Sequence, residues 1–255
     1  MNDVDAVIRR ALGEVFPAAQ LEVRQLRAVP GRAGSWTTLC SGAYGWLDPE
    51  TVTHPARAET LFDLASVTKL FVVTAFMTLV EEAAAGLDQP VSDVLPEFSG
   101  MRAIGPYEDP LVPGAWVAVE PAPGDEPTSG VDAGKVTFRQ LLTHSSGLPA
   151  WRPLYRAGSP DAALTLAVDT HFSYRTGSRV VYSDIGLILL GLAIERLAHV
   201  SLDEAVRRRV TAPLGLGATR YLPLVSHRSA PVLSQGVAPT EMCARRDRRL
   251  VGEVH

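Results

Sequence analysis

A serine and a lysine with the spacing of a nucleophile and its base stand at the start of an apolar stretch. Ser66 and Lys69 belong to the run Ser66-Val67-Thr68-Lys69, and residues three apart share one face of a helix. The lysine amine can then reach the serine hydroxyl, and a serine becomes a strong nucleophile when a neighbouring base takes its proton. A lysine serves as that base when burial or a nearby cation lowers its pKa. The spacing therefore predicts an acyl-transfer site.

The use of basic residues supports a role for this amine. Lys69 and Lys135 are the only two lysines of the chain, and arginine is used everywhere else. Arginine cannot release its proton and so could not act as the base. The alternative is an ordinary helix start, with Ser66 near the N-cap and Lys69 extending to solvent. This motif alone leaves both interpretations open.

A second candidate motif, Tyr182-Ser183-Asp184, lies between two apolar segments. A phenol that is hydrogen-bonded to a lysine can carry a proton between the nucleophile and the leaving group, and Asp184 can line the same cleft as a substrate-binding residue. In the alternative interpretation, Tyr182 is a half-buried packing residue and Asp184 caps the helix that follows.

Between these motifs, residues 141–149 read Leu-Leu-Thr-His-Ser-Ser-Gly-Leu-Pro. This stretch ends a helix that we expect to begin near Thr137, and its Ser-Ser-Gly-Leu-Pro part indicates a rigid exit turn. A single histidine in such a place is more often a hydrogen-bonded structural residue than a catalyst. We therefore predict a structural role for His144.

Taken together, FDLASVTK at 62–69, LLTHSSGLP at 141–149 and YSDIGLILLG at 182–191 resemble the serine β-lactamase-related family. That family includes class C β-lactamases, D-alanyl-D-alanine carboxypeptidases and esterases, and the resemblance covers the chain from about Ala6 to His255. It implies that Ser66 is the acylated nucleophile, Lys69 its partner base and Tyr182 a second acid/base.

The resemblance also implies an α+β fold of the β-lactamase/transpeptidase type, in which a mainly helical domain accompanies a partial antiparallel sheet. Asp184 stands where the family usually has Asn, and Asp occurs there in the esterase-like and carboxypeptidase-like branches. This departure disfavours a narrow penicillinase function and is compatible with acyl transfer.

A third family motif, Lys-Thr-Gly or His-x-Gly, is not found after Asp184. His199-Val200-Ser201 and His227-Arg228-Ser229 lack the glycine, and His255 is the last residue. We therefore expect a truncated chain, about the N-terminal two-thirds of the family domain, whose activity is weak or absent. Loss of one oxyanion donor costs roughly a hundredfold to a thousandfold in turnover. A separate C-terminal fragment carrying the third motif could complement the chain at its open sheet edge.

The pattern of apolar, glycine and proline residues predicts the elements around these motifs. We expect an N-terminal amphipathic helix and two strands at 21–28 and 36–45 within residues 1–60. Residues 61–230 are predicted to form the helical domain with both motifs, and residues 231–255 to begin a truncated return to the sheet.

Within the helical domain we expect helices over about 66–85, 184–197 and 198–216. An insertion at about 101–134, rich in proline, glycine and acidic residues, is predicted to be either a substrate-selecting lid or a disordered loop.

The overall composition is that of a globular protein with a sizeable core, at 255 residues, 46% hydrophobic and 20% charged. A net charge of −4 and one short arginine-rich run at 245–249 do not favour nucleic-acid binding. Neither a membrane span nor a secretory signal is predicted, which makes a cytoplasmic location the default. The two cysteines, Cys40 and Cys243, fit a reducing compartment and do not suggest a metal cluster.

Three functions compete on these observations. The first is a serine hydrolase that acts on a small-molecule ester, amide or β-lactam without a metal or organic cofactor. The second is an inactive or acyl-ligand-binding protein of the same fold. The third is a helical interaction module, which the joint occurrence of the motifs disfavours.

Overall fold

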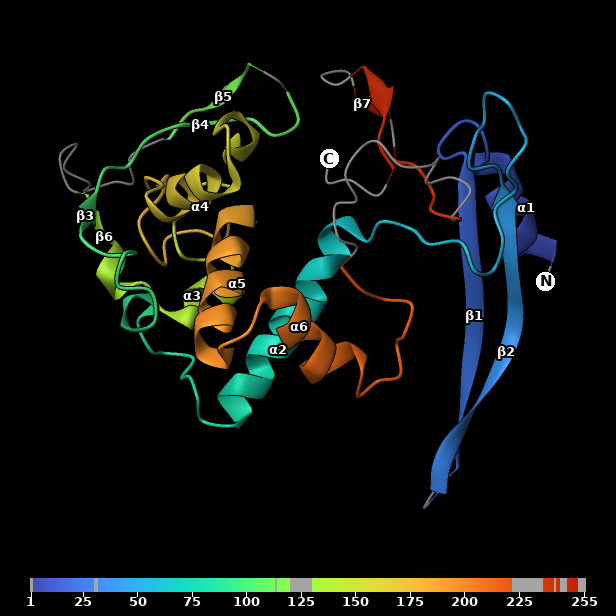
Figure 1. The fold of residues 1–255 in the computed structure, drawn as a ribbon, viewed down its shortest axis with the longest axis horizontal. Coiled ribbons are helices and arrows are strands. Elements are labelled where there is room, and N and C mark those ends of the chain that lie inside the picture. Colours follow the sequence, from blue (N-terminus) through green and yellow to red (C-terminus); the bar gives the residue numbers. More distant parts are fainter. Residues whose placement is uncertain are drawn as a thin grey trace. The chain divides into compact units, whose positions relative to one another are not determined.

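The computed structural model describes residues 2–29, 32–112, 114–119, 130–221, 236–240, 242–243 and 247–251. The chain divides into two compact units (Figure 1). The first, here called the sheet unit, consists of Met1–Ala65 and Tyr221–His255, and the second, the helical unit, is Ser66–Arg220. Ser66, Lys69, Tyr182 and Asp184 all lie in the helical unit.

The sheet unit is built on one long hairpin. Strand β1 (Ala18–Val29) pairs with β2 (Arg32–Gly45) in antiparallel register, with an irregularity between Val23 and Arg24. Helix α1 (Asn2–Ala11) precedes the hairpin, and β7 (Met242–Cys243) pairs with β8 (Arg248–Arg249). The expected helix and hairpin are present, and both strands are longer than the sequence predicted.

Two further sequence features fall in the sheet unit. Cys40 and Cys243 are free thiols. Of the arginine-rich run, Arg249 forms an ion pair with Glu50, while residues 245 and 246 lie outside the described part of the chain.

The helical unit begins with a 3₁₀ turn, η1 (Ala65–Val67), that leads directly into α2 (Thr68–Glu81). The remaining longer helices are α4 (Pro160–Val168) and α5 (Asp184–Ala198). The shorter ones are η2 (Val91–Asp93), η3 (Ala133–Lys135), α3 (Phe138–Leu142), η4 (Leu154–Arg156), α6 (Leu202–Val206) and the π-helical η5 (Arg207–Thr211).

The core of the helical unit lies between α2, α3 and α5 (Figure 1). Phe76 of α2 packs against Phe138 of α3 with ring centroids 4.8 Å apart, and both side chains are fully buried. Leu190 and Ile194 of α5 are also fully buried. Burial of such side chains stabilises the fold by about 1.5–3 kcal/mol each, and the resulting packing fixes the helices on which the candidate residues lie.

Three of the predicted helix boundaries are wrong, and one of them is the end of α2, which lies at Glu81 and not near residue 85. Regular α-helix begins at Thr68 because Ser66 lies in the preceding 3₁₀ turn. The expected helix over 198–216 is interrupted because His199 adopts a left-handed conformation with φ of 53°, which ends α5. A left-handed residue is a common helix stop, and α6 starts only at Leu202.

The described parts of the insertion are ordered. Strand β3 (Met101–Arg102) pairs with β6 (Val131–Asp132), and β4 (Tyr107–Glu108) pairs with β5 (Trp116–Val117). Trp151 donates from Nε1 to the Glu108 carbonyl at 2.7 Å, and Arg156 forms an ion pair with the buried Glu108 carboxylate at 3.0 Å. These two contacts attach the small β4–β5 hairpin to the rest of the unit.

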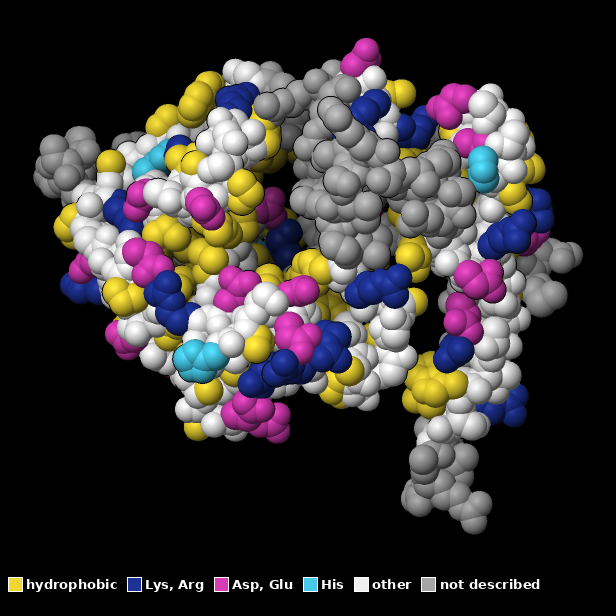
Figure 2. Space-filling view, viewed as in Figure 1, with side chains coloured by type: hydrophobic (Ala, Val, Ile, Leu, Met, Phe, Trp, Pro, Cys, Tyr) yellow, Lys and Arg dark blue, Asp and Glu magenta, His cyan; other side chains and the backbone are white. Residues whose placement is uncertain are grey.

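On the face shown in Figure 2, Lys and Arg side chains of the helical unit are interspersed with Asp and Glu. Among the described residues no single helix is both long and apolar enough to cross a membrane.

Candidate active site

Ser66 occupies the turn immediately before α2, where its side chain is exposed. The preceding residue, Ala65, has a φ of 43°, in the left-handed region that costs a non-glycine residue free energy. The nucleophile candidate therefore follows a strained residue and stands at the beginning of a helix that is anchored in the core.

Lys69 lies in the first turn of α2 and extends back over Ser66. Its Nζ is 3.0 Å from the Ser66 Oγ, a hydrogen-bond distance, and its side chain is 20% exposed. The contact that the three-residue spacing predicts is therefore present, and the alternative in which Lys69 simply extends into solvent does not describe this side chain.

Tyr182 and Asp184, at the start of α5, also contact the Lys69 amine. The Asp184 Oδ1 is 2.7 Å from the Lys69 Nζ, and the centroid of the Tyr182 ring is 4.8 Å from it. The Lys69 Nζ thus has three neighbours, namely Ser66, Tyr182 and Asp184, although the last two are far from it in the sequence.

The residue between Tyr182 and Asp184 makes the helix cap. Ser183 accepts a hydrogen bond from the Gly186 N–H at its Oγ, at 3.2 Å, and donates from the same oxygen to the Pro149 carbonyl at 2.6 Å. The alternative in which Asp184 caps α5 is therefore wrong. Tyr182 is 52% exposed and its ring packs against that of His144, so it is also the half-buried packing residue of the alternative interpretation.

The charge state of Lys69 differs from what a general base requires. Its partial burial disfavours the ammonium, but the hydrogen bonds to Asp184 and Tyr182 favour it more, so the pKa of Lys69 is raised above its usual value. The lowered pKa that a lysine base requires is therefore not produced by this arrangement. The Asp184 carboxylate is the reason, because it places a negative charge at 2.7 Å.

The segment 144–150 lies alongside the Tyr182 segment and is hydrogen-bonded to it repeatedly. The carbonyls of His144 and Ala150 accept the N–H groups of Val181 and Asp184 at 2.8 and 2.7 Å. The sequence predicted only an exit turn here. What it did not reveal is that this turn is the support on which residues 173–184 are held.

Gly147 shows how closely the two segments approach. Its carbonyl accepts the N–H groups of Ser173 and Tyr174 at 2.8 and 3.0 Å. Its φ is 87°, and a Cβ added there would lie 2.2 Å from the Tyr174 carbonyl oxygen. Both the conformation and the space require glycine, which was the one signal in the sequence that could have indicated this contact.

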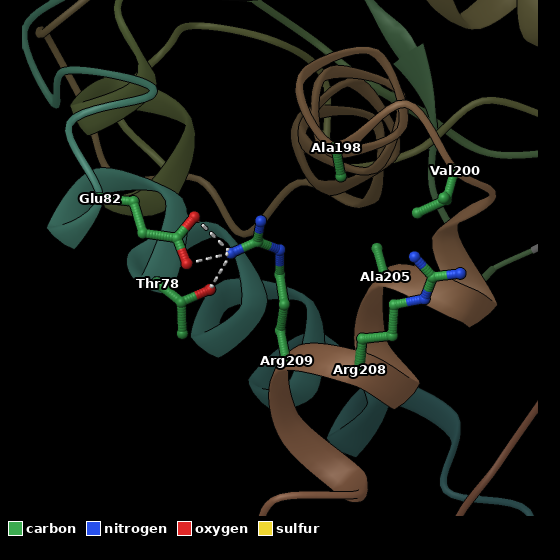
Figure 3. A pocket seen from close by; sticks show the side chains of 7 residues that line it. All are labelled: Thr78, Glu82, Ala198, Val200, Ala205, Arg208 and Arg209. Atoms are coloured by element: carbon green, nitrogen blue, oxygen red, sulfur yellow. Dashed lines mark hydrogen bonds and ion pairs between the residues drawn. The ribbon is translucent and has the colours of Figure 1, made fainter.

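A pocket at the other end of α2 is occupied by an ion pair (Figure 3). Arg209 of η5 donates to the Glu82 carboxylate at 2.8 Å and to the Thr78 Oγ1 at 3.1 Å. Thr78 lies ~18 Å along the helix from Ser66. All of these contacts are made by one nitrogen, Nη1. The ion pair ties η5 to α2 and contains none of the candidate site residues.

Among the residues that the structure describes, no three His, Cys, Asp or Glu side chains are grouped so as to hold a metal ion.

Comparisons with known proteins show which family and fold the chain resembles. A family model described as Beta-lactamase matches residues 36–242. The chain is 30% identical over 236 residues to an N-acetylmuramyl-L-alanine amidase of Bacillus subtilis, covering 88% of this chain and 47% of that protein. It is 30% identical over 195 residues to a putative D-alanyl-D-alanine carboxypeptidase of Salmonella paratyphi B, covering 72% of this chain and 39% of the relative. The chain thus spans about half the length of the curated relatives it matches, or less.

Solved structures show the same fold at lower identity. An octameric penicillin-binding protein homologue from Pyrococcus abyssi superposes with a TM-score of 0.67 at 21% identity, covering 98% of this chain and 50% of that one. A mutant of a class C beta-lactamase superposes with a TM-score of 0.68 at 18% identity, covering 100% of this chain and 57% of the other. The α+β fold of the β-lactamase/transpeptidase type, expected from the sequence, is therefore confirmed.

Proposed function

This chain belongs to the beta-lactamase family, and on that premise we propose that it is a serine hydrolase that acts through an acyl-enzyme on Ser66. The observation that carries the proposal is the position of the Lys69 Nζ, within hydrogen-bond distance of both the Ser66 Oγ and the Asp184 Oδ1. An amine in that position can take the serine proton as the oxygen attacks a carbonyl carbon.

The proposed reaction has two halves. In the first, the Ser66 Oγ forms a bond to the substrate carbonyl carbon, its proton passes to the neutral-amine form of Lys69, and Tyr182 delivers a proton to the leaving group. In the second, water attacks the acyl carbon, the bond to the Ser66 Oγ breaks, and one proton of the water passes to that oxygen as the acid leaves. The Lys69 ammonium returns its proton to the Tyr182 phenolate, which restores all three groups. No metal or organic cofactor enters these steps.

The proposed substrates are small molecules with an ester, amide or β-lactam carbonyl. Support comes from the names of the relatives, an amidase and a putative carboxypeptidase, both of which denote hydrolysis of a carbon–nitrogen bond. The Asp at position 184, which the resemblance to the family associates with esterase-like and carboxypeptidase-like members, favours an amide or ester over a penicillin.

A second function has observations of its own. A protein that binds an acyl ligand without turnover, or an inactive one, is favoured by the raised pKa of Lys69, which leaves little neutral amine at neutral pH. The exposed Ser66 also favours it, since oxyanion stabilisation works best where water is excluded.

We further propose that a C-terminal fragment with the third motif can complement this chain. In the described sheet unit β1 and β2 pair only with each other, and an open strand edge is a template for another strand. The test is co-expression with the C-terminal half of an active relative. The proposal predicts a gain in hydrolysis of a chromogenic ester, and no gain from a complex shown to form would refute it.

The experiment that tests the primary function is intact-mass spectrometry after exposure to a fluorophosphonate and, separately, to a penicillin. We expect one adduct per chain, mapped to Ser66, and no adduct on Ser66→Ala. Ser178→Ala is the matched control, because the Ser178 Oγ donates only to the nearby Arg175 carbonyl, and it should be labelled like the wild type.

Lys69→Arg separates charge from proton transfer in the same assay. Arginine keeps the positive charge but cannot take a proton, so we expect labelling to slow by about a hundredfold or more. An absence of any adduct on a wild-type chain with native circular dichroism would refute the activated nucleophile and favour the acyl-binding function. Labelling of Ser66→Ala at the wild-type rate would place the nucleophile elsewhere.

A further inference from the structure

Three contacts connect His144 to the residue that the proposed mechanism uses as its second acid/base. The His144 carbonyl accepts the Val181 N–H at 2.8 Å, and its Nδ1 accepts the Ser183 N–H at 3.1 Å. The His144 ring also packs against the Tyr182 ring, with centroids 4.7 Å apart and planes inclined by 39°. Both neighbours of Tyr182 in the chain, and its own ring, are thus held by one residue.

The contact with Ser183 fixes the protonation state of the imidazole. A ring nitrogen accepts a hydrogen bond only when it carries no proton, so Nδ1 is bare and the neutral ring has its proton on Nε2. A second proton would turn Nδ1 into a donor facing another donor, and the hydrogen bond would be lost.

The surroundings of His144 favour the neutral form. Its partial burial and the nearby Lys69 ammonium both lower the pKa of His144, while the Asp184 carboxylate raises it to a smaller extent. These two charged groups come from α2 and α5, and Tyr182 is the further titratable group in contact.

The backbone of His144 is itself strained. Its φ of 55° lies in the left-handed region, where a non-glycine residue costs free energy that the surrounding contacts must offset. The strained backbone of His144 is held in place by the hydrogen bonds that the 144–150 segment makes with the Tyr182 segment.

We propose that His144 is a positioning residue whose neutral imidazole, through the hydrogen bond from the Ser183 N–H, helps to hold the Tyr182 phenol beside Lys69, and that protonation of the imidazole weakens this hold. The inference rests on the proposed function, in which Tyr182 transfers the proton to the leaving group. Of the three contacts, the hydrogen bond from the Ser183 N–H to Nδ1 is the one that protonation removes, while Ser183 and Asp184 stay hydrogen-bonded to the carbonyls of Pro149 and Ala150. The exposed phenol itself contacts the His144 ring and Lys69.

Two substitutions separate the parts of this role. His144→Asn keeps an acceptor near the Nδ1 position and tolerates a left-handed φ, but it cannot titrate. His144→Phe keeps a ring against Tyr182 but leaves the Ser183 N–H without its acceptor. The matched control is His199→Asn, because His199 is also a left-handed histidine, with φ of 53°, at the opposite end of α5.

The first readout is the rate of Ser66 labelling by a fluorophosphonate between pH 4 and 8. In every variant the rate should fall with decreasing pH, because less of Lys69 is neutral. For the wild type and His199→Asn we expect a steeper fall below the His144 pKa, and for His144→Asn this additional acid-side fall should be absent. His144→Phe should slow labelling about tenfold at every pH with unchanged half-saturation by the reagent. Labelling by a folded His144→Phe chain within twofold of the wild type would overturn the inference, as would an identical acid-side fall in His144→Asn.

The second readout does not depend on catalysis. The amide signal of Ser183 in ¹H–¹⁵N NMR spectra should shift with the titration of His144 in the wild type and stay constant in His144→Asn. A constant Ser183 signal in the wild type, while the His144 ring titrates, would refute the positioning role of His144. If the wild type is not labelled but this signal shifts as expected, the proposed hydrolase function is refuted and the positioning of Tyr182 by His144 is supported.

Discussion

At the scale of single residues, the pairing of Lys69 with Asp184 determines what the candidate site can do. The raised pKa of Lys69 means that this pair stabilises the fold fully at pH values below the amine's ordinary pKa of 10.5. That stabilisation is lost as the pH rises through the higher pKa of the folded state. The ion pair with Asp184 therefore holds the Lys69 amine beside Ser66 but also keeps it protonated near neutral pH, where it cannot act as a base.

Replacing Asp184 by Asn should bring the base into a usable range. Asp184→Asn removes the charge at 2.7 Å and keeps a hydrogen-bonding side chain, so the pKa of Lys69 falls and the neutral amine forms at lower pH. We expect the rise of Ser66 labelling with pH to move down by about one pH unit or more. Parallel pH profiles of labelling by the fluorophosphonate measure this shift.

The chain offers a matched control in its only other lysine. Asp132→Asn removes a carboxylate 3.7 Å from the exposed Lys135, so the charge change is the same but lies outside the site. It should leave the labelling profile in place. An Asp184→Asn profile that coincides with the wild type, or moves to higher pH, contradicts the role assigned to the ion pair.

At the scale of elements, segment 144–150 acts as a support for the Tyr182-Ser183-Asp184 motif. Segment 144–150 is hydrogen-bonded along its length to residues 173–184, and Ser183 then caps α5. The helix therefore begins at a position that the support sets, and Asp184 in its first turn faces Lys69.

Gly147→Ala should damage this support severely. The added Cβ would lie 2.2 Å from the Tyr174 carbonyl oxygen and would also sit at a φ of 87°. We expect the free energy of unfolding to fall by about 2–4 kcal/mol, because strain and overpacking add. Urea denaturation followed by circular dichroism measures the loss.

Gly158→Ala is the control for the strain alone, since its φ is 81° and no atom lies within 4 Å of the added Cβ. It should cost about 1 kcal/mol. Equal losses for the two variants would show that the contact with residue 174 does not matter to stability.

The sequence predicted the ends of elements that local residues determine, and it missed those that depend on the folded backbone. The start of α5 was predicted because the apolar run begins next to Asp184, although the cap was assigned to Asp184 and not to Ser183. The hairpin was predicted because Pro30 and Gly31 interrupt two strand-like stretches. The stop at His199 was missed, since a left-handed histidine carries no compositional mark. The raised pKa of Lys69 was missed because it arises from Asp184, whose distance from the amine only the folded chain defines.

At the scale of the whole molecule, the large apolar core belongs to one unit. All residues of the main core cluster lie between positions 72 and 210, within the helical unit. The long hairpin of the sheet unit instead exposes Leu26, Trp36 and Leu39 to about half or more of their surface. A hairpin with so little covering is marginally stable by itself.

Hydrogen exchange should therefore separate the two units. We expect amides of β1 and β2 to exchange through openings of lower free energy than those of α2 and α5. Leu190→Ala, which truncates a fully buried side chain of α5, should lower protection in α2 and α5 by about 2–5 kcal/mol. Exchange mass spectrometry under native conditions gives both comparisons. Equal protection of hairpin and helices, or an equal loss in the hairpin on Leu190→Ala, would show that the chain opens as a single cooperative body.

The support formed by residues 144–150 also bears on how such a site can change over generations. Its contacts with the Tyr182 segment use main-chain carbonyls, those of His144, Ser145, Ser146, Gly147, Pro149 and Ala150. A side chain can be exchanged at most of these positions without removing an acceptor. Natural or designed substitutions can thus change the side chains beside Tyr182, while the main-chain hydrogen bonds that position the reactive groups are kept.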